Sequence, residues 1–145
     1  MPYHERVQPS LPLLALAALA GASFGLILLP LSPLVAALVA LVLGAATVAV
    51  ALLASPSVVV DADGFRAGAA RIEPEFLGDV EVLDRERLRA VLGVEADARA
   101  HLCHRAYAAG AVRVEIVDPR DPTPYWVVSS NRPAELADAL AVLRR

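Results

Sequence analysis

The chain of 145 residues contains no lysine, and all 13 of its basic residues are arginine. The absence of lysine excludes a Walker-type phosphate loop, in which a lysine contacts the β- and γ-phosphates, and it excludes a pyridoxal Schiff base. Cysteine is nearly absent as well, because Cys103 is the only one and cannot form a disulfide within the chain. The net charge of −3 provides no general basic surface, so nucleic acid is not an expected partner.

Charged residues are missing altogether from Val7 to Val60, a run of 54 residues. No soluble core needs such a run, which is too long for one transmembrane helix and suits two. Residues 11–29 and 34–54 would span roughly 28 and 31 Å at about 1.5 Å per residue, close to the ~30 Å thickness of a bilayer core. Pro30 and Pro33 break the backbone hydrogen bonding between them. A cleaved signal peptide is the alternative, but its apolar region is usually only about 7–15 residues long.

The chain is therefore predicted to have three parts. These are a juxtamembrane segment (1–10), a transmembrane hairpin of two helices (11–54) and a cytoplasmic domain (55–145). Arg6, Arg66 and Arg71 lie near the outer ends of the hairpin, which favours termini on the cytoplasmic side of the plasma membrane.

Small residues recur at every fourth position in both predicted spans. They are Ala17, Gly21 and Gly25 in the first and Ala36, Ala40 and Gly44 in the second. Such stripes let helix backbones approach closely, so we expect the two helices to pack through them, with homo-oligomerisation through one stripe as the alternative. Neither span contains Asp, Glu, Arg or His, which ion pathways usually need at depth, so the hairpin is expected to be an anchor in the bilayer.

The remaining residues alternate between strand and helix signals. Strands are predicted over 58–60, 65–72, 80–83, 111–117 and 125–130, the last two pairing as a hairpin, whereas 94–110 is ambiguous. Asp84 and Gly93 bound a short helix, and Pro133 begins a terminal helix with an apolar face. The fold class is thus a helical membrane hairpin plus a small α+β domain, with a mostly antiparallel sheet and a C-terminal capping helix.

Two segments carry the candidate site residues. His101, Cys103 and His104 are metal-type ligands, but structural zinc sites use four ligands in spaced pairs, so no metal, cofactor or catalytic site is predicted. The loop before and within the last strand combines prolines with residue types common at interfaces. The predicted interaction surface consists of Asp118, Arg120, Asp121, Tyr125, Trp126 and Arg132. The alternative is structural, with the prolines shaping a hairpin and Trp126 anchoring the core.

Several short motifs along the chain resemble one family. They are Tyr3-x-Glu5-Arg6, Arg66-x-Gly68-x-Ala70-Arg71, Leu77-Gly78-x-Val80, Asp97-x-Arg99-Ala100-x-Leu102, Asp118-Pro119-x-Asp121-Pro122-Thr123-Pro124-Tyr125-Trp126, Ser129-Ser130 and Arg132-Pro133-x-x-Leu136. Together they resemble an actinobacterial family of two-span membrane proteins known as domain of unknown function 3093, which implies no particular activity. More loosely, residues 57–72 and 125–145 resemble the two ends of bacterial pleckstrin-homology-like domains, although the helix expected from Asp84 to Gly93 departs from that pattern.

These observations favour a membrane-anchored, non-enzymatic module that interacts with a protein partner. The first alternative is a domain that senses a lipid or a small ligand. The second is a small membrane-bound enzyme, for which Asp118, Asp121, His101 and His104 are the titratable groups that would have to converge.

Overall fold

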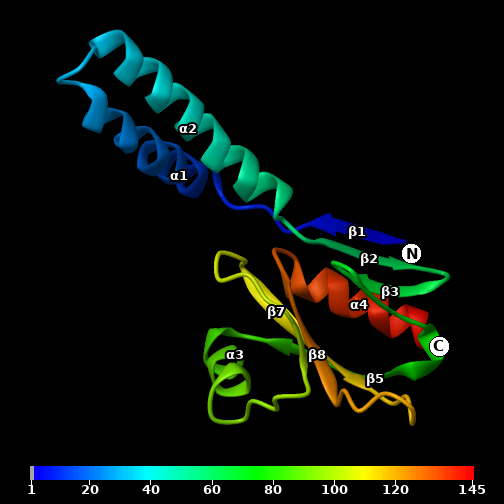
Figure 1. Ribbon diagram of the computed structural model, residues 1–145. Helices are drawn as coiled ribbons and strands as arrows, with labels where there is room; N and C mark the ends of the chain where they lie inside the picture. Colours follow the sequence, from blue (N-terminus) through cyan, green and yellow to red (C-terminus); the bar gives the residue numbers. More distant parts are fainter. Residues whose placement is uncertain (1) are drawn as a thin grey trace. The chain divides into compact units, whose positions relative to one another are not determined.

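The computed structural model describes residues 2–145, which form two compact units (Figure 1). The hairpin unit is Gln8–Ser55. The sheet unit joins the N-terminal residues up to Val7 with Pro56–Arg145. Residues 2–7 therefore belong to the fold of the C-terminal part rather than to the hairpin.

The hairpin unit consists of α1 (Leu11–Ser23), a 3-10 helix η1 (Phe24–Leu28) and α2 (Pro33–Leu53). The predicted second span, 34–54, agrees with α2 to within one residue at each end, and the Ser32 hydroxyl accepts a hydrogen bond from the Val35 amide at its start. The first predicted span, 11–29, corresponds to the helical segment Leu11–Leu28, in which the α-helix ends at Ser23 and the chain continues as the 3-10 helix η1. There the Ser23 hydroxyl donates to the Ala20 carbonyl, a back-bond that competes with regular helix geometry. Both apolar segments are long enough to cross a membrane.

The first sheet is an antiparallel meander in the order β1-β2-β3-β4. Its strands are β1 (Tyr3–Arg6), β2 (Ser57–Asp61), β3 (Gly64–Ala67) and β4 (Ala70–Ile72). The single strand predicted over 65–72 is therefore two strands, separated at Gly68, whose φ of +63° suits a tight turn. The turn between β2 and β3 ends at Gly64 with φ +137°, a conformation that favours glycine.

The second sheet has the order β5-β7-β8-β6. Its strands are β5 (Leu77–Leu83), β6 (His101–Cys103), β7 (Gly110–Ile116) and β8 (Tyr125–Ser130). β7 and β8 pair as the predicted antiparallel hairpin, with Val112 opposite Val128. β6 pairs with β8 in parallel, so this sheet is mixed, and the ambiguous stretch 94–110 contains an edge strand.

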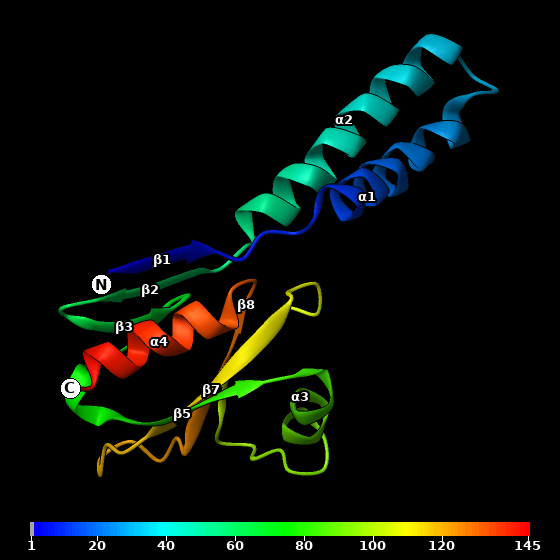
Figure 2. The ribbon, with the colours of Figure 1, turned by 180° about the vertical axis from the view of Figure 1, so that it is seen from behind.

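Helices cover both faces of the second sheet (Figure 2). A 3-10 turn, η2 (Pro74–Phe76), leads into β5. The helix α4 (Pro133–Leu143) runs between the two sheets and buries Leu136 and Leu140 in the main core. The helix α3 (Arg85–Leu92) packs Val91 against the opposite face of the second sheet. Because both faces are covered, every residue of β8 is buried.

Candidate functional site

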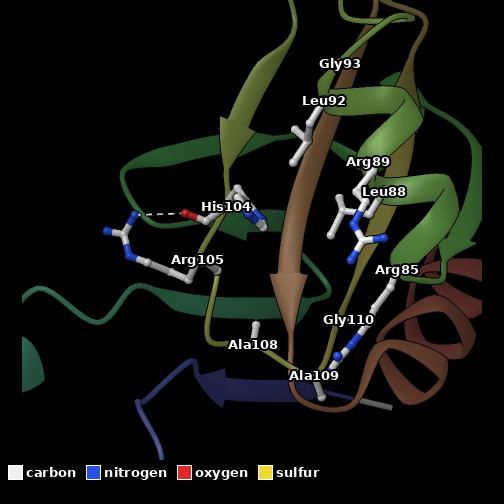
Figure 3. A pocket seen from close by; sticks show the side chains of 11 residues that line it. Arg85, Leu88, Arg89, Leu92, Gly93, His104, Arg105, Ala108, Ala109 and Gly110 are labelled. Atoms are coloured by element: carbon white, nitrogen blue, oxygen red, sulfur yellow. Dashed lines mark hydrogen bonds between the residues drawn. The ribbon is translucent and has the colours of Figure 1, made fainter. Parts of the chain in front are cut away.

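A hollow of about 460 Å³ lies between α3 and the segment that links β6 to β7 (Figure 3). We call it the arginine pocket. Its lining residues are Arg85, Leu88, Arg89, Leu92 and Gly93 from α3 and its C-terminal end, and His104, Arg105, Ala106, Ala108, Ala109 and Gly110 from the linking segment. Neither Asp nor Glu lines it, and its volume falls in the range of small-ligand pockets.

The packing of α3 sets the direction of the arginines that line this pocket. Asp84 caps the helix by accepting a hydrogen bond from the Arg87 amide at 2.7 Å, and Val91 buries the inner face. Arg85 and Arg89 follow each other at four-residue spacing, and both extend from α3 over the hollow in Figure 3. Within residues 2–145, neither of these two side chains takes part in an ion pair or a hydrogen bond. They therefore leave two guanidinium groups available to a ligand.

Arg87 lies on another side of the same helix, and its guanidinium forms ion pairs with two glutamates. Its guanidinium donates to Glu81 at 2.9 Å and to Glu95 at 2.6 Å. These hydrogen bonds, that to Glu95 most strongly, raise the pKa of Arg87 above its ordinary value. Two acidic residues that flank α3 in the sequence, Glu81 and Glu95, thus pair with Arg87.

His104 contributes an uncharged polar group to the pocket. Its Nδ1 lies 2.9 Å from the hydroxyl oxygen of Ser129, a buried residue of β8. Burial lowers the pKa of His104, and the nearby charge of Arg105 lowers it further, so the imidazole is neutral at neutral pH. Arg105 donates to the His104 carbonyl at 3.1 Å, and its side chain extends away from the hollow in Figure 3.

The two aromatic residues of the predicted interaction surface lie inside the protein. Tyr125 and Trp126 are each only 5% exposed, which corrects the expectation that they form a surface. The Trp126 ring packs between Phe65 of β3, at a centroid distance of 5.8 Å, and His101, at 4.9 Å. The structural alternative, in which Trp126 anchors the core, describes this arrangement.

The polar residues of that predicted surface fall into two separate groups. Asp118 and Asp121 accept hydrogen bonds from amides of their own loop, and Arg120 pairs with Asp118 at 3.4 Å. The hydrogen bonds from Thr123 hold the pKa of Asp121 below its usual value. Arg132 instead pairs with Glu135 and donates to the backbone of β1, so it does not join the loop residues.

The residues considered for a metal or a nucleophile are engaged in packing. His101 packs against Trp126 in a tilted ring contact, and its Nε2 is buried without a hydrogen-bond partner within residues 2–145. Burial raises the pKa of the Cys103 thiol, which is the opposite of what an activated thiolate needs. Across the described part of the chain, no group of three or more His, Cys, Asp and Glu side chains is arranged to hold a metal ion.

The predicted small-residue stripes lie where α1 and η1 meet α2. A Cβ atom added to Gly21 would lie 2.5 Å from the Leu43 carbonyl oxygen, and one added to Gly25 would lie 2.6 Å from that of Ala36. Thr47, which the pattern did not single out, donates its hydroxyl to the Ala17 carbonyl at 2.9 Å. The close approach of the two helices requires glycine at both positions.

A buried polar cluster at β1 is another feature that sequence reasoning missed. Glu5 is only 6% exposed, and its carboxylate accepts hydrogen bonds from the hydroxyls of Tyr3 (2.7 Å) and Ser130 (2.6 Å) and from the Asn131 amide (2.8 Å). The cluster ties β1 to the junction between β8 and α4. Burial raises the pKa of Tyr3 to about 12, and the carboxylate of Glu5 adds to the shift.

Comparison with known proteins gives one result. Among curated proteins and among solved structures, nothing matches this chain. The model of one protein family, described as "Protein of unknown function (DUF3093)", matches residues 2–140. This match covers both units and nearly the whole sequence, so the chain belongs to the DUF3093 family.

Proposed function

We propose that this protein is a membrane-anchored, non-enzymatic binding module. In this proposal the hairpin unit spans the plasma membrane twice, both termini are cytoplasmic, and the sheet unit binds its partner on that side. The observation that carries the proposal is the hairpin itself, with its apolar exterior and its close helix packing.

The exposed surface of the hairpin suits lipid. Large apolar side chains point outward, and Leu11, Leu16, Leu19, Ile27, Leu41 and Leu53 are all more than 60% exposed. The segment carries no charged residue, and nearly all its backbone hydrogen bonds are made within its helices, as a bilayer requires. In water the same surface would be a strong aggregation liability.

The positions of the titratable residues support a binding role over a catalytic one. A reaction by acid–base chemistry would need Asp118, Asp121, His101 and His104 to converge on one substrate. Asp118 and Asp121 instead shape their own loop, His101 is packed against Trp126, and His104 bonds to Ser129.

The identity of the partner is the second part of the proposal. The sequence favours a protein partner, but the aromatic side chains that would have anchored it are buried. The arginine pocket favours a small ligand instead, because it is concave and two of its arginines are unpaired in the described chain. The resemblance to pleckstrin-homology-like domains stays a prediction and adds no argument for either partner.

Labelling of single cysteines tests the anchor and its orientation. In a Cys103→Ser background, Leu31→Cys places a thiol in the loop of the hairpin, and Ala62→Cys places one in the β2–β3 turn of the sheet unit. With a membrane-impermeant maleimide, we expect Leu31→Cys to label in intact cells and Ala62→Cys to label only in inverted vesicles. The protein should also stay in the membrane pellet after alkaline carbonate extraction. Extraction into the soluble fraction, or equal labelling of both sites from outside, would contradict the proposal.

A further inference from the structure

We propose that the arginine pocket binds an anion that carries a phosphate group, held by Arg85 and Arg89 with His104 on the opposite wall. This inference rests on the proposed function for its binding role and adds to it the chemical class of the ligand. Nothing in the sequence pattern pointed to this site, because its two walls come from α3 and from the β6–β7 segment.

The separation of charges around α3 is the first argument. Arg87 pairs with Glu81 and Glu95, which leaves Arg85 and Arg89 as the uncompensated cations of the helix. Like charges at four-residue spacing repel one another, so this pair weakens the free helix. Glu86, the remaining acid of α3, lines a different hollow together with Asp84 and Arg87. A bound anion would relieve the repulsion between the two arginines.

The opposite wall offers a hydrogen-bond donor and open backbone. The contact between Ser129 Oγ and His104 Nδ1 is 2.9 Å, shorter than its 3.4 Å contact with the Arg105 carbonyl. In the tautomer whose Nδ1 accepts from the Ser129 hydroxyl, the ring hydrogen lies on Nε2, the nitrogen left for a ligand. Ala106, Ala108, Ala109 and Gly110 supply the rest of this wall, and their small size lets a ligand approach the main chain.

The shape and composition of the pocket favour phosphate over other anions. Guanidinium groups match phosphate oxygens with two parallel hydrogen bonds, and two arginines suit a doubly charged group. No aromatic residue lines the pocket, so a nucleobase would have no ring on which to stack. A hollow of about 460 Å³ accommodates a single head group or a small phosphate ester rather than a polymer. With a net charge of −3, the protein as a whole does not attract anions, so binding depends on the local charge of the pocket.

A phosphate group could come from a soluble ester or from a lipid head group, and two titrations distinguish them. The full chain is placed in nanodiscs of phosphatidylcholine and titrated with inorganic pyrophosphate by isothermal calorimetry. In the second arm, binding of the chain from mild detergent to nanodiscs with and without phosphatidic acid is compared. Saturable binding of pyrophosphate with no preference for phosphatidic acid indicates a soluble source, and a preference for phosphatidic acid that excess pyrophosphate abolishes indicates a lipid source. Both outcomes support the site.

The double variant Arg85→Gln/Arg89→Gln tests the residues. Each lost charged hydrogen bond should weaken binding about tenfold, so affinity should fall by about two orders of magnitude. The matched control, Arg99→Gln/Arg120→Gln, removes the same charge from exposed arginines that pair with neighbours two residues away, and it should bind as the wild type does. Both variants change only exposed side chains, and an unchanged melting temperature verifies their folding.

Two results would overturn the inference. One is the absence of saturable binding in both arms. The other is an equal loss of affinity in the pocket variant and in the control, because this would show attraction by overall charge. Membrane insertion is measured separately by cysteine labelling. If the titrations fail while the labelling shows insertion, the phosphate site is refuted and the proposed membrane anchor still stands.

Discussion

Because of Tyr3, the stability of the sheet unit should decrease at alkaline pH. Its hydroxyl donates to Glu5 at 2.7 Å, and burial raises its pKa to about 12, above the ordinary value of 10.0. The folded state therefore holds this proton more tightly than the unfolded state does. The resulting stabilisation is complete below about pH 10 and is lost as the pH rises to about 12. We expect the free energy of unfolding to fall across this interval. In Tyr3→Phe that part of the decrease should be absent, and the variant should be less stable by about 1 kcal/mol at pH 8.

Trp126 provides the measurement, since it is the only tryptophan and is buried in the core of the sheet unit. Its fluorescence during unfolding by guanidinium, with the full chain in detergent, reports the stability at each pH. Tyr107→Phe is the matched control, because it also removes one hydroxyl hydrogen bond, to the Val7 carbonyl at 3.2 Å. This control should keep the alkaline decrease of the wild type. An equally steep decrease in Tyr3→Phe would contradict the role of Tyr3.

At the scale of single residues, inward-facing polar groups were the hardest to predict. In β1 the buried residues are Tyr3 and Glu5, and a carboxylate at an inward position breaks the alternation by which strands are recognised. The hydrogen bonds from Tyr3 and from Ser130 and Asn131, the last two more than 120 residues away, offset the cost of burying Glu5. For Trp126 the error has the opposite sense, because this residue is predicted on the surface and lies in the core. A tryptophan beside a proline-rich loop is compatible with either position.

Among the secondary-structure elements, the hairpin packing makes a specific prediction. A Cβ atom on Gly44 would lie 3.6 Å from the Cβ of Ala22, a separation that suits a disulfide. Ala22→Cys/Gly44→Cys, in a Cys103→Ser background, should therefore cross-link within one chain under mild oxidation, as a mobility shift on non-reducing gels shows. Adding Gly21→Leu should largely abolish the cross-link, because its Cβ would clash with the Leu43 backbone and separate the helices. Ala20→Leu, on the exposed side of α1, should leave the cross-link intact. A cross-link that forms only between two chains would indicate self-association instead.

Elements with strong local signals could be predicted closely. The helix from Asp84 to Gly93 has its cap and its stop signal, and the structure confirms it as α3. The last helix is confirmed as α4, with Leu136 and Leu140 buried, because its apolar spacing matches the helical period. β6 could not be predicted, because three residues are too few to show an alternating apolar pattern. This segment is a strand only because it pairs with β8. The break at Gly68 was also missed, since one glycine among strand formers does not show where the chain turns.

At the scale of the whole molecule, the candidate site could not be predicted from the sequence. Arg85 and Arg89 look like ordinary surface residues of a charged helix, and His104 lies inside the ambiguous segment 94–110. Their common pocket exists because α3 and the β6–β7 segment pack on the second sheet, and their availability depends on Glu81 and Glu95 being taken by Arg87. The order of elements along the chain was largely predictable, whereas the pairing of charges across elements was not.

The division of the chain into two units predicts that the sheet unit can be obtained without the hairpin. The Val7 amide donates to the Pro56 carbonyl at 3.0 Å, so the ends left by removing Gln8–Ser55 are already adjacent. A flexible linker of about four residues from Val7 to Pro56 should close this gap at little entropic cost. We expect the joined protein to be monomeric without detergent and to unfold cooperatively, as followed by Trp126 fluorescence. Residues 56–145 alone should be several kcal/mol less stable, since they lack β1, the buried Val7 and the hydrogen bonds of Glu5. Aggregation of the joined protein would contradict independent folding of the sheet unit, and equal stability of the two proteins would show that β1 is not part of the cooperative unit.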